Sequence, residues 1–427
     1  MKSKKVLLVS IVMSVMLMML VTSCGKKDEE EKQAVTKQAP AVVVDEAKVY
    51  KLGLSLAITG PTSDAGNPYA KGVEDYFKYV NEEKLLGKDT IDCTIRDDQY
   101  KTDVTKRNFE DYIGQGIVFY LNYSTGSTLG LKKDFDEEKI ATIPASYHAG
   151  NLVDSNYIFL PIASYSDQLV LLAEYVAKNH KGEKAKVALF VHPSAFGRGP
   201  VSDVEKAVAA GLNIELVEVV EHGKDLDNTA MLKRLMSKNV QYVISQTIQS
   251  PVATMIKDSQ RLGLTASSFG EAGKITFMGA HYTGGNDLIA LAGSATENYF
   301  WTTAFTITSV TGPATDAQLA LAKRFGRDDK TANSHNYAAG IMVAEVAAET
   351  IIRAKARGVE INKETLYNEM NAMNGYNSYH PLTCTGPVNY SKTDRAGVDM
   401  LQIYSVQGGV FKKVGEPMQS EYMQKIK

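Results

Sequence analysis

Short apolar runs alternate with stretches in which apolar residues recur every three or four positions, from about residue 50 to residue 280. The short runs are typical of buried strands, and the recurrence is typical of amphipathic helices. The predicted strands cover residues 50–58, 91–95, 117–121, 141–143, 157–162, 187–192, 214–220, 242–245 and 275–278. The predicted helices cover residues 69–80, 104–113, 128–138, 167–178, 201–210, 230–238, 252–262 and 336–356. This alternation predicts parallel sheets with crossover helices on both faces.

The length of 427 residues predicts more than one domain, because a single core usually stops growing at about 250–300 residues. The alternating pattern divides into two α/β units of similar size in series. The apolar stretch 336–356 is predicted to be a buried core helix, because Glu345, Glu349 and Arg353 interrupt it well short of a membrane span.

The N-terminus has the order of a removable targeting segment. Lysines precede the uncharged apolar stretch 6–21, and Val21-Thr22-Ser23-Cys24 resembles a bacterial lipobox. We therefore predict a lipoprotein signal peptide at 1–23, rather than a retained membrane helix, and a lipid anchor on Cys24. Residues 24–48 are charged and aperiodic and predict a disordered tether, with a short exposed helix as the alternative. This predicts a lipid-anchored, extracytoplasmic protein of the cell envelope.

Charge and cysteine content narrow the function classes. With 47 Lys+Arg against 49 Asp+Glu, the net charge of −2 makes nucleic acid an unlikely ligand. Three cysteines without close spacing cannot build a thiolate zinc site. Two unpaired thiols at Cys93 and Cys384 are favoured over a bridge between them, which stays open.

Catalytic and cofactor motifs are incomplete. No phosphate-binding P-loop occurs, and the dinucleotide-like Gly197-Arg198-Gly199 has Ser202 where a third glycine is needed. The stretch 122–126 approaches a hydrolase nucleophile elbow but lacks its first glycine, so a serine hydrolase is a weak alternative. No two histidines have the i, i+4 spacing of a zinc helix. We predict no enzyme activity, no cofactor and no metal.

A series of short motifs resembles one known family over about residues 49–414. The motifs include Leu54-Ser55-Leu56-Ala57-Ile58-Thr59-Gly60-Pro61, Asp97-Asp98, Tyr123-Ser124-Thr125-Gly126-Ser127-Thr128, Phe196-Gly197, Phe277-Met278-Gly279 and Gly386-Pro387-Val388-Asn389-Tyr390. In this order they resemble the type I periplasmic solute-binding proteins, in the branched-chain amino acid-binding (leucine-binding) group of ABC importers.

The resemblance implies an α/β fold with two Rossmann-like, doubly wound lobes, joined by three crossovers, and a ligand cleft between the lobes. The crossovers would lie near Pro161, at 300–305 and at 389–397. The expected N-terminal lobe comprises 49–161 and 303–388, and the C-terminal lobe 162–302 and 389–427. The resemblance also implies a monomer whose partners are the permease and ATPase subunits of an importer.

The resemblance also implies where a ligand carboxylate binds. Ser124 matches the serine that holds it, Ser146 and His148 match the loop after the fourth strand, and Phe196 matches a stacking aromatic. The expected ligand-binding residues are Ser124, Thr125, Ser146, Tyr147, His148, Phe196, Ile248, Gln249 and His281.

Three positions depart from the family pattern. His281 stands where an acid should meet the ligand ammonium, Ile248 replaces a tyrosine and Ala65 an aromatic. A buried ammonium needs a charge partner, so the absence of an acid at position 281 favours a flat or larger organic acid as ligand. A plain L-amino acid is an equally open alternative. The second alternative requires an acid such as Asp287 to shift inward. A ligand-sensing receptor component on the same fold is a further alternative to an importer subunit.

Overall fold

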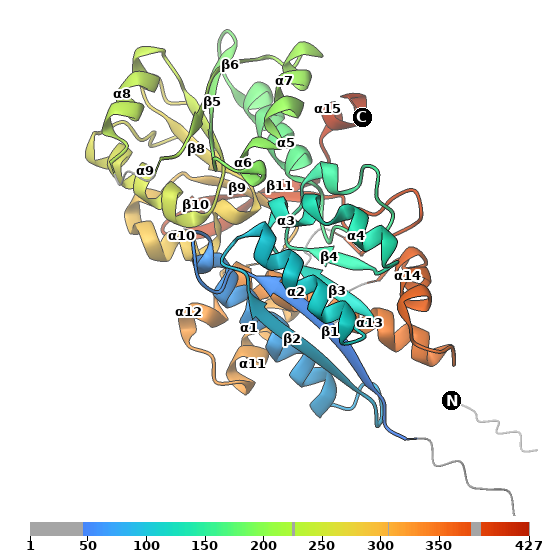
Figure 1. The fold of residues 1–427 in the computed structure, drawn as a ribbon. Helices are drawn as coiled ribbons and strands as arrows, with labels where there is room; N and C mark the ends of the chain where they lie inside the picture. The colour runs from blue at the N-terminus through green and yellow to red at the C-terminus, as the bar shows by residue number, and fades with distance from the viewer. Residues whose placement is uncertain (1–45, 224–226, 306, 377–385, 427) are drawn as a thin grey trace, which may run out of the picture. The chain divides into compact units, whose positions relative to one another are not determined.

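Two separate β-sheets form the framework of the part of the chain that is described (Figure 1). The computed structural model describes residues 46–223, 227–305, 307–376 and 386–426. The predicted signal peptide, most of the tether, Cys24 and Cys384 lie outside these residues. Within the described ranges, no helix is both long and apolar enough to cross a membrane.

The smaller sheet has four parallel strands in the order β2-β1-β3-β4. Its strands are β1 (Val49–Leu56), β2 (Thr90–Asp97), β3 (Phe119–Asn122) and β4 (Thr142–Pro144). Every residue of β3 is buried, as expected for a central parallel strand covered on both faces.

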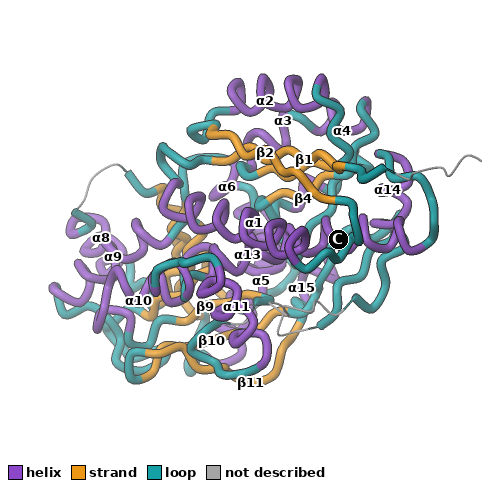
Figure 2. Tube along the Cα trace, turned by 90° about the horizontal axis from the view of Figure 1, so that it is seen from below, coloured by secondary structure: helices purple, strands orange, loops and turns teal. Residues whose placement is uncertain are grey.

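Helices cover both faces of this sheet, with α2 and α4 on one side and α1 and α13 on the other (Figure 2). The helices of this part of the chain are α1 (Ser63–Glu82), α2 (Thr102–Gly114), α3 (Thr125–Gly130), α4 (Lys132–Glu137), α11 (Pro313–Arg324), α12 (Asp329–Ala332), α13 (His335–Ala356) and α14 (Lys363–Asn371), with a 3₁₀ turn η1 (Ala149–Asn151). Helices α1 and α13 cross at Gly72 and Gly340. A Cβ atom at Gly340 would lie 2.0 Å from the carbonyl oxygen of Tyr69, so only glycine permits this close approach. As predicted, α13 is a buried helix.

The larger sheet has seven strands in the order β11-β10-β9-β8-β7-β5-β6, and all pairs except those made by β10 are parallel. Its strands are β5 (Ala185–Val191), β6 (Ile214–Glu221), β7 (Tyr242–Gln246), β8 (Thr276–Gly279), β9 (Phe300–Thr303), β10 (Leu401–Gln407) and β11 (Val410–Met418). Its helices are α5 (Tyr165–Asn179), α6 (Ala195–Arg198), α7 (Val201–Ala209), α8 (Thr229–Ser237), α9 (Gln249–Arg261), α10 (Gly285–Ala292) and α15 (Glu421–Ile426), with the 3₁₀ turns η2 (His281–Thr283) and η3 (Gly293–Thr296). Parallel strands linked by helices confirm the α/β fold class.

The chain passes between the sheets at three places, as predicted. It leaves the smaller sheet after β4, returns after β9, and leaves it again before β10. The first and third crossing segments run side by side, because Leu160 N–H donates to Arg395 O and Gly397 N–H donates to Leu160 O, both at 2.8 Å. The lobe boundaries given above stay predictions.

Two predicted elements differ from the structure. Residues 128–138 form two short helices, α3 and α4, that meet at Leu131, instead of one helix. Residues 157–162 are not a strand but part of the first crossing segment, with isolated bridges at Ile158 and Leu160. Cys93 is a free thiol in β2, and burial raises its pKa above the usual range of thiols.

Candidate functional site

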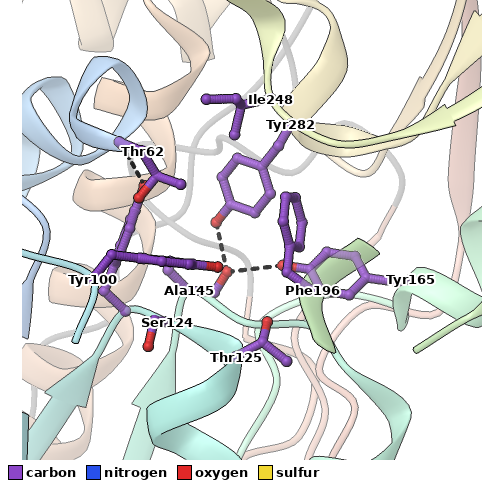
Figure 3. A pocket seen from close by; sticks show the side chains of 10 residues that line it. Thr62, Tyr100, Ser124, Thr125, Ala145, Tyr165, Phe196, Ile248 and Tyr282 are labelled. Carbon is purple, nitrogen blue, oxygen red and sulfur yellow. Dashed lines mark hydrogen bonds between the residues drawn. The ribbon is translucent and has the colours of Figure 1, made fainter. Parts of the chain in front are cut away.

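A pocket lies where the carboxyl ends of strands from both sheets face each other, with about 280 Å³ of atom-free space when its opening to solvent is included (Figure 3). Loops that follow β1 to β4 supply one part of its wall, and α5 with the loops after β5, β7 and β8 supplies the rest. The lining residues are Thr62, Tyr100, Tyr123, Ser124, Thr125, Ala145, Tyr165, Phe196, Ile248 and Tyr282. This is where open parallel sheets usually bind ligands.

The polar corner of the pocket is the start of α3. Ser124 is the N-cap of this helix: its Oγ accepts the amide of Ser127 at 3.1 Å and lies 2.6 Å from Ser127 Oγ. The amides of Thr125 and Gly126, in the first turn, have no acceptor within the helix. The Ser124 hydroxyl and these two amides are therefore suited to hold an anion.

Aromatic rings make most of the remaining wall. The hydroxyls of Tyr282 and Tyr165 both donate to the carbonyl of Ala145, at 2.7 and 3.2 Å (Figure 3). The Phe196 ring meets those of Tyr165 and Tyr282 edge-on, with centroids 5.3 and 5.9 Å apart. These contacts join η2, α5 and α6 of the larger sheet to the loop after β4.

Tyr100 reaches the pocket from an unusual turn. Gln99 and Tyr100 both have positive φ, 55° and 62°, which non-glycine residues rarely adopt. The turn is held because Asp97 Oδ1 accepts the amide of Gln99 at 3.0 Å and Asp98 Oδ1 accepts that of Tyr100 at 2.9 Å. Asp97 also accepts the amides of Ile58 and Thr59 after β1. The Asp97-Asp98 pair thus fixes the loops after β1 and β2 together and directs the Tyr100 side chain.

The nine predicted ligand-binding residues divide into two groups. Ser124, Thr125, Phe196 and Ile248 line the pocket, and Ser146, Tyr147, His148, Gln249 and His281 do not.

Four residues of the second group lie behind or beside the wall. Ser146 Oγ bonds to Thr125 Oγ1 at 2.8 Å, and the Tyr147 ring stacks on that of Tyr282 with centroids 5.7 Å apart. His148 Nδ1 accepts the amide of Gly150 at 2.9 Å. Gln249 Nε2 faces the ring nitrogens of His335 at 3.4 Å. Ser146 and Tyr147 therefore support lining residues from behind, whereas His148 and Gln249 bond to residues outside the lining.

His281 is fully buried behind Tyr282, with ring centroids 4.6 Å apart. Its Nδ1 lies 2.8 Å from Thr303 Oγ1, and its Nε2 has no hydrogen-bond partner. Burial, with His335 nearby, lowers its pKa well below the usual range. The imidazole is therefore neutral and off the pocket surface.

Among the described residues, no charged side chain lines the pocket. Asp287, the acid that could have shifted inward, bonds instead to the Ser334 hydroxyl and to His335 Nδ1, each at 3.0 Å. Burial raises the pKa of Tyr100 to about 12 and raises that of Tyr282 well above its usual range, so these hydroxyls stay neutral. Within the described ranges, no group of three or more His, Cys, Asp or Glu residues could hold a metal ion.

Sequence reasoning did not select Thr62, Tyr100, Tyr123 or Tyr165 for the site. Tyr123 belongs to the motif Tyr123-Ser124-Thr125-Gly126-Ser127-Thr128, and Thr62 lies in the loop after β1. Open parallel sheets bind ligands beyond the carboxyl ends of their strands, so the position of both residues after a strand was a usable signal. Tyr165 follows a crossing segment instead of a strand, and Tyr100 enters through its positive-φ turn, so the apolar pattern held no signal for either.

Comparison with known proteins places this geometry in a family. The sequence profile described as "Periplasmic binding protein" matches residues 49–410. A leucine-, isoleucine-, valine-, threonine- and alanine-binding protein of Pseudomonas aeruginosa is 22% identical over 255 residues, which cover 59% of this chain and 65% of the relative. The match therefore spans less than two thirds of that relative's length.

Solved structures agree over nearly the whole folded part. A branched-chain amino acid ABC transporter protein from Thermus thermophilus, solved with bound valine, is 42% identical with a TM-score of 0.83, covering 89% of this chain and 99% of that one. A leucine-binding protein from Thermotoga maritima shares the fold at 17% identity, with a TM-score of 0.67 and coverage of 86% and 98%. The chain belongs to the periplasmic binding protein family, as the order of its sequence motifs predicted.

Proposed function

We propose that this protein is a solute-binding component of an ABC importer that takes up a small carboxylate with a branched aliphatic or aromatic body. The observation that carries the proposal is the pocket itself, in which one anion-holding corner at Ser124 faces a wall of aromatic rings. Valine is bound to the relative from Thermus thermophilus, which supports a ligand of that size here.

The ligand we propose carries no ammonium group. Burying an ammonium without a partner costs several kcal/mol. The pocket lining offers no carboxylate, and Asp287 is occupied by the start of α13. The Ala145 carbonyl at the pocket wall already accepts from two tyrosine hydroxyls, so it is poorly placed to accept from an ammonium as well.

A thermal-shift panel tests the ligand class. We expect 3-methylbutanoate, 4-methylpentanoate and 3-phenylpropanoate to raise the melting temperature more than L-valine, L-leucine and L-phenylalanine. The shift reports binding because the ligand stabilises only the folded protein. If the amino acids bind at micromolar concentration and the deaminated acids do not, the charge part of the proposal is wrong and the binding function stands. If neither series binds, the binding function itself fails.

Binding is favoured over hydrolysis at this site. The Ser124 hydroxyl bonds to the amide and hydroxyl of Ser127, whereas a serine nucleophile needs an adjacent general base. We therefore propose that the ligand leaves unchanged. A sensor role would use the same pocket, and importer uptake is preferred because the similar Thermus thermophilus protein belongs to an ABC transporter.

We further propose that the protein is anchored to a membrane through acylated Cys24, on the sequence order of residues 1–24 alone. Cys24→Ala should move the protein from the membrane fraction to the soluble fraction. Cys93→Ala, which removes another thiol, should leave fractionation unchanged. A wild-type protein without acyl chains would contradict the anchor.

A further inference from the structure

A second and larger cavity lies beside the ligand pocket. It encloses about 1070 Å³ of space that includes open solvent, against about 280 Å³ for the pocket. Its lining includes Asp64, Phe190, His192, His222 and Ser250, contributed by elements that pack on both sheets.

Few side chains separate the two spaces. Ile248 lines both, and Thr62 lines the pocket while its neighbours Pro61 and Ser63 line the second cavity. The Tyr100 ring lines the pocket on one side and meets the His192 ring of the second cavity edge-on, with centroids 6.0 Å apart. Figure 3 shows Thr62 and Tyr100 on the side of the pocket away from Tyr165. Tyr100, Thr62 and Ile248 together form a partition.

The second cavity is chemically unlike the pocket. The rings of His192 and His222 lie 5.0 Å apart, edge to face. Burial lowers the pKa of His192 to about 4 and also lowers that of His222, so both imidazoles are neutral at pH 7. His222 Nε2 is buried with no hydrogen-bond partner. The Asp64 carboxylate also lines the cavity, where it accepts the Ser250 hydroxyl, and burial raises its pKa. Together with the imidazoles it offers hydrogen-bonding groups for a polar substituent without negative charge, whereas the pocket wall away from Ser124 is mostly aromatic.

We propose that Tyr100 and Ile248 determine specificity by closing the pocket against this cavity, so that the protein selects short acids and rejects acids with a longer chain. The inference rests on the proposed function of the same pocket. Tyr100 is suited to the role because the Asp97-Asp98 contacts hold its backbone turn, and its ring packs edge-on against the rings of Tyr123 and His192, with centroids 6.4 and 6.0 Å apart. Shortening either side chain would join the two spaces and admit a longer acid whose far end is polar.

Isothermal titration calorimetry on the full-length chain tests this with three probes: 4-methylpentanoate, octanoate and 8-hydroxyoctanoate. We expect the wild type to bind 4-methylpentanoate at least tenfold more tightly than either eight-carbon acid. Tyr100→Ala and Ile248→Ala should each shift the ratio of these affinities at least tenfold in favour of the eight-carbon acids. The gain should be larger for 8-hydroxyoctanoate than for octanoate, because only its hydroxyl can bond to the neutral imidazoles.

Matched controls separate a partition from simple loosening. Tyr157→Ala and Ile113→Ala remove the same side chains at half-buried positions that do not line the pocket, and they should keep the wild-type ratio. An unchanged ratio in Tyr100→Ala and Ile248→Ala, or equal weakening for short and long acids, would overturn the inference. A wild type that binds no probe and no amino acid would instead overturn the proposed function.

Discussion

Ser124→Ala is expected to weaken every carboxylate ligand by about 10- to 100-fold. A hydrogen bond to a charged group contributes roughly 1.5–3 kcal/mol, and Ser124 supplies the hydroxyl at the anion-holding corner of the pocket. The loss should be similar for aliphatic and aromatic acids, because the corner meets the carboxylate that they share. Titration calorimetry with 4-methylpentanoate and 3-phenylpropanoate measures it.

Stability must be followed in the same variant, because Ser124 also caps α3. Loss of a cap costs about 1 kcal/mol of folding free energy. Asn362→Ala removes the cap of α14, where the Asn362 side chain accepts the Thr365 amide at 3.0 Å, well apart from the pocket lining. It should lower the melting temperature without changing affinity. Equal affinities in Ser124→Ala and the wild type would remove Ser124 from the site.

The strands and helices of both sheets were largely predictable, because the spacing of apolar residues indicates which faces of each element are buried. The two departures show what this spacing does not indicate. Leu131 and Phe135 are both buried and continue the helical recurrence, yet the helix is interrupted between α3 and α4. The prediction missed this interruption because an apolar pattern indicates which face is buried and does not show whether the backbone hydrogen bonds are continuous. The run 157–162 is apolar because it crosses between lobes through the core, where it makes only isolated bridges.

The site was predictable in part for a related reason. The family resemblance selected Ser124, Phe196 and Ile248, and all three follow parallel strands, whose carboxyl ends must gather at one edge of a sheet. Depth behind that edge depends on packing, which placed His281 behind Tyr282. Tyr100 depends on two consecutive positive φ angles that only the Asp97-Asp98 contacts explain.

Arg327→Met is expected to lower the free energy of unfolding by about 3–5 kcal/mol, because it strands a buried carboxylate. Asp75, on α1, is fully buried, and Arg327 donates to its two oxygens at 2.8 and 2.6 Å. The Tyr337 hydroxyl of α13 donates to the same carboxylate at 2.8 Å. Chemical denaturation measures the change, with Arg107→Met as control: its pair with Asp103 is largely exposed, so the loss should stay within about 0.5 kcal/mol.

A double variant separates the stranded charge from lost packing. Asp75→Leu combined with Arg327→Met replaces both charges with apolar groups, and such replacements of buried pairs are often close to neutral. The double variant should therefore be more stable than Arg327→Met alone, even though the Tyr337 hydroxyl loses its acceptor. If it is no more stable, the packing of the Arg327 stem between α1 and the segment after α11 accounts for the loss, because long charged side chains also bury apolar surface. The sign of the difference in unfolding free energy between the double variant and Arg327→Met therefore decides whether the charge or the packing of Arg327 stabilises the contact between α1 and the segment after α11.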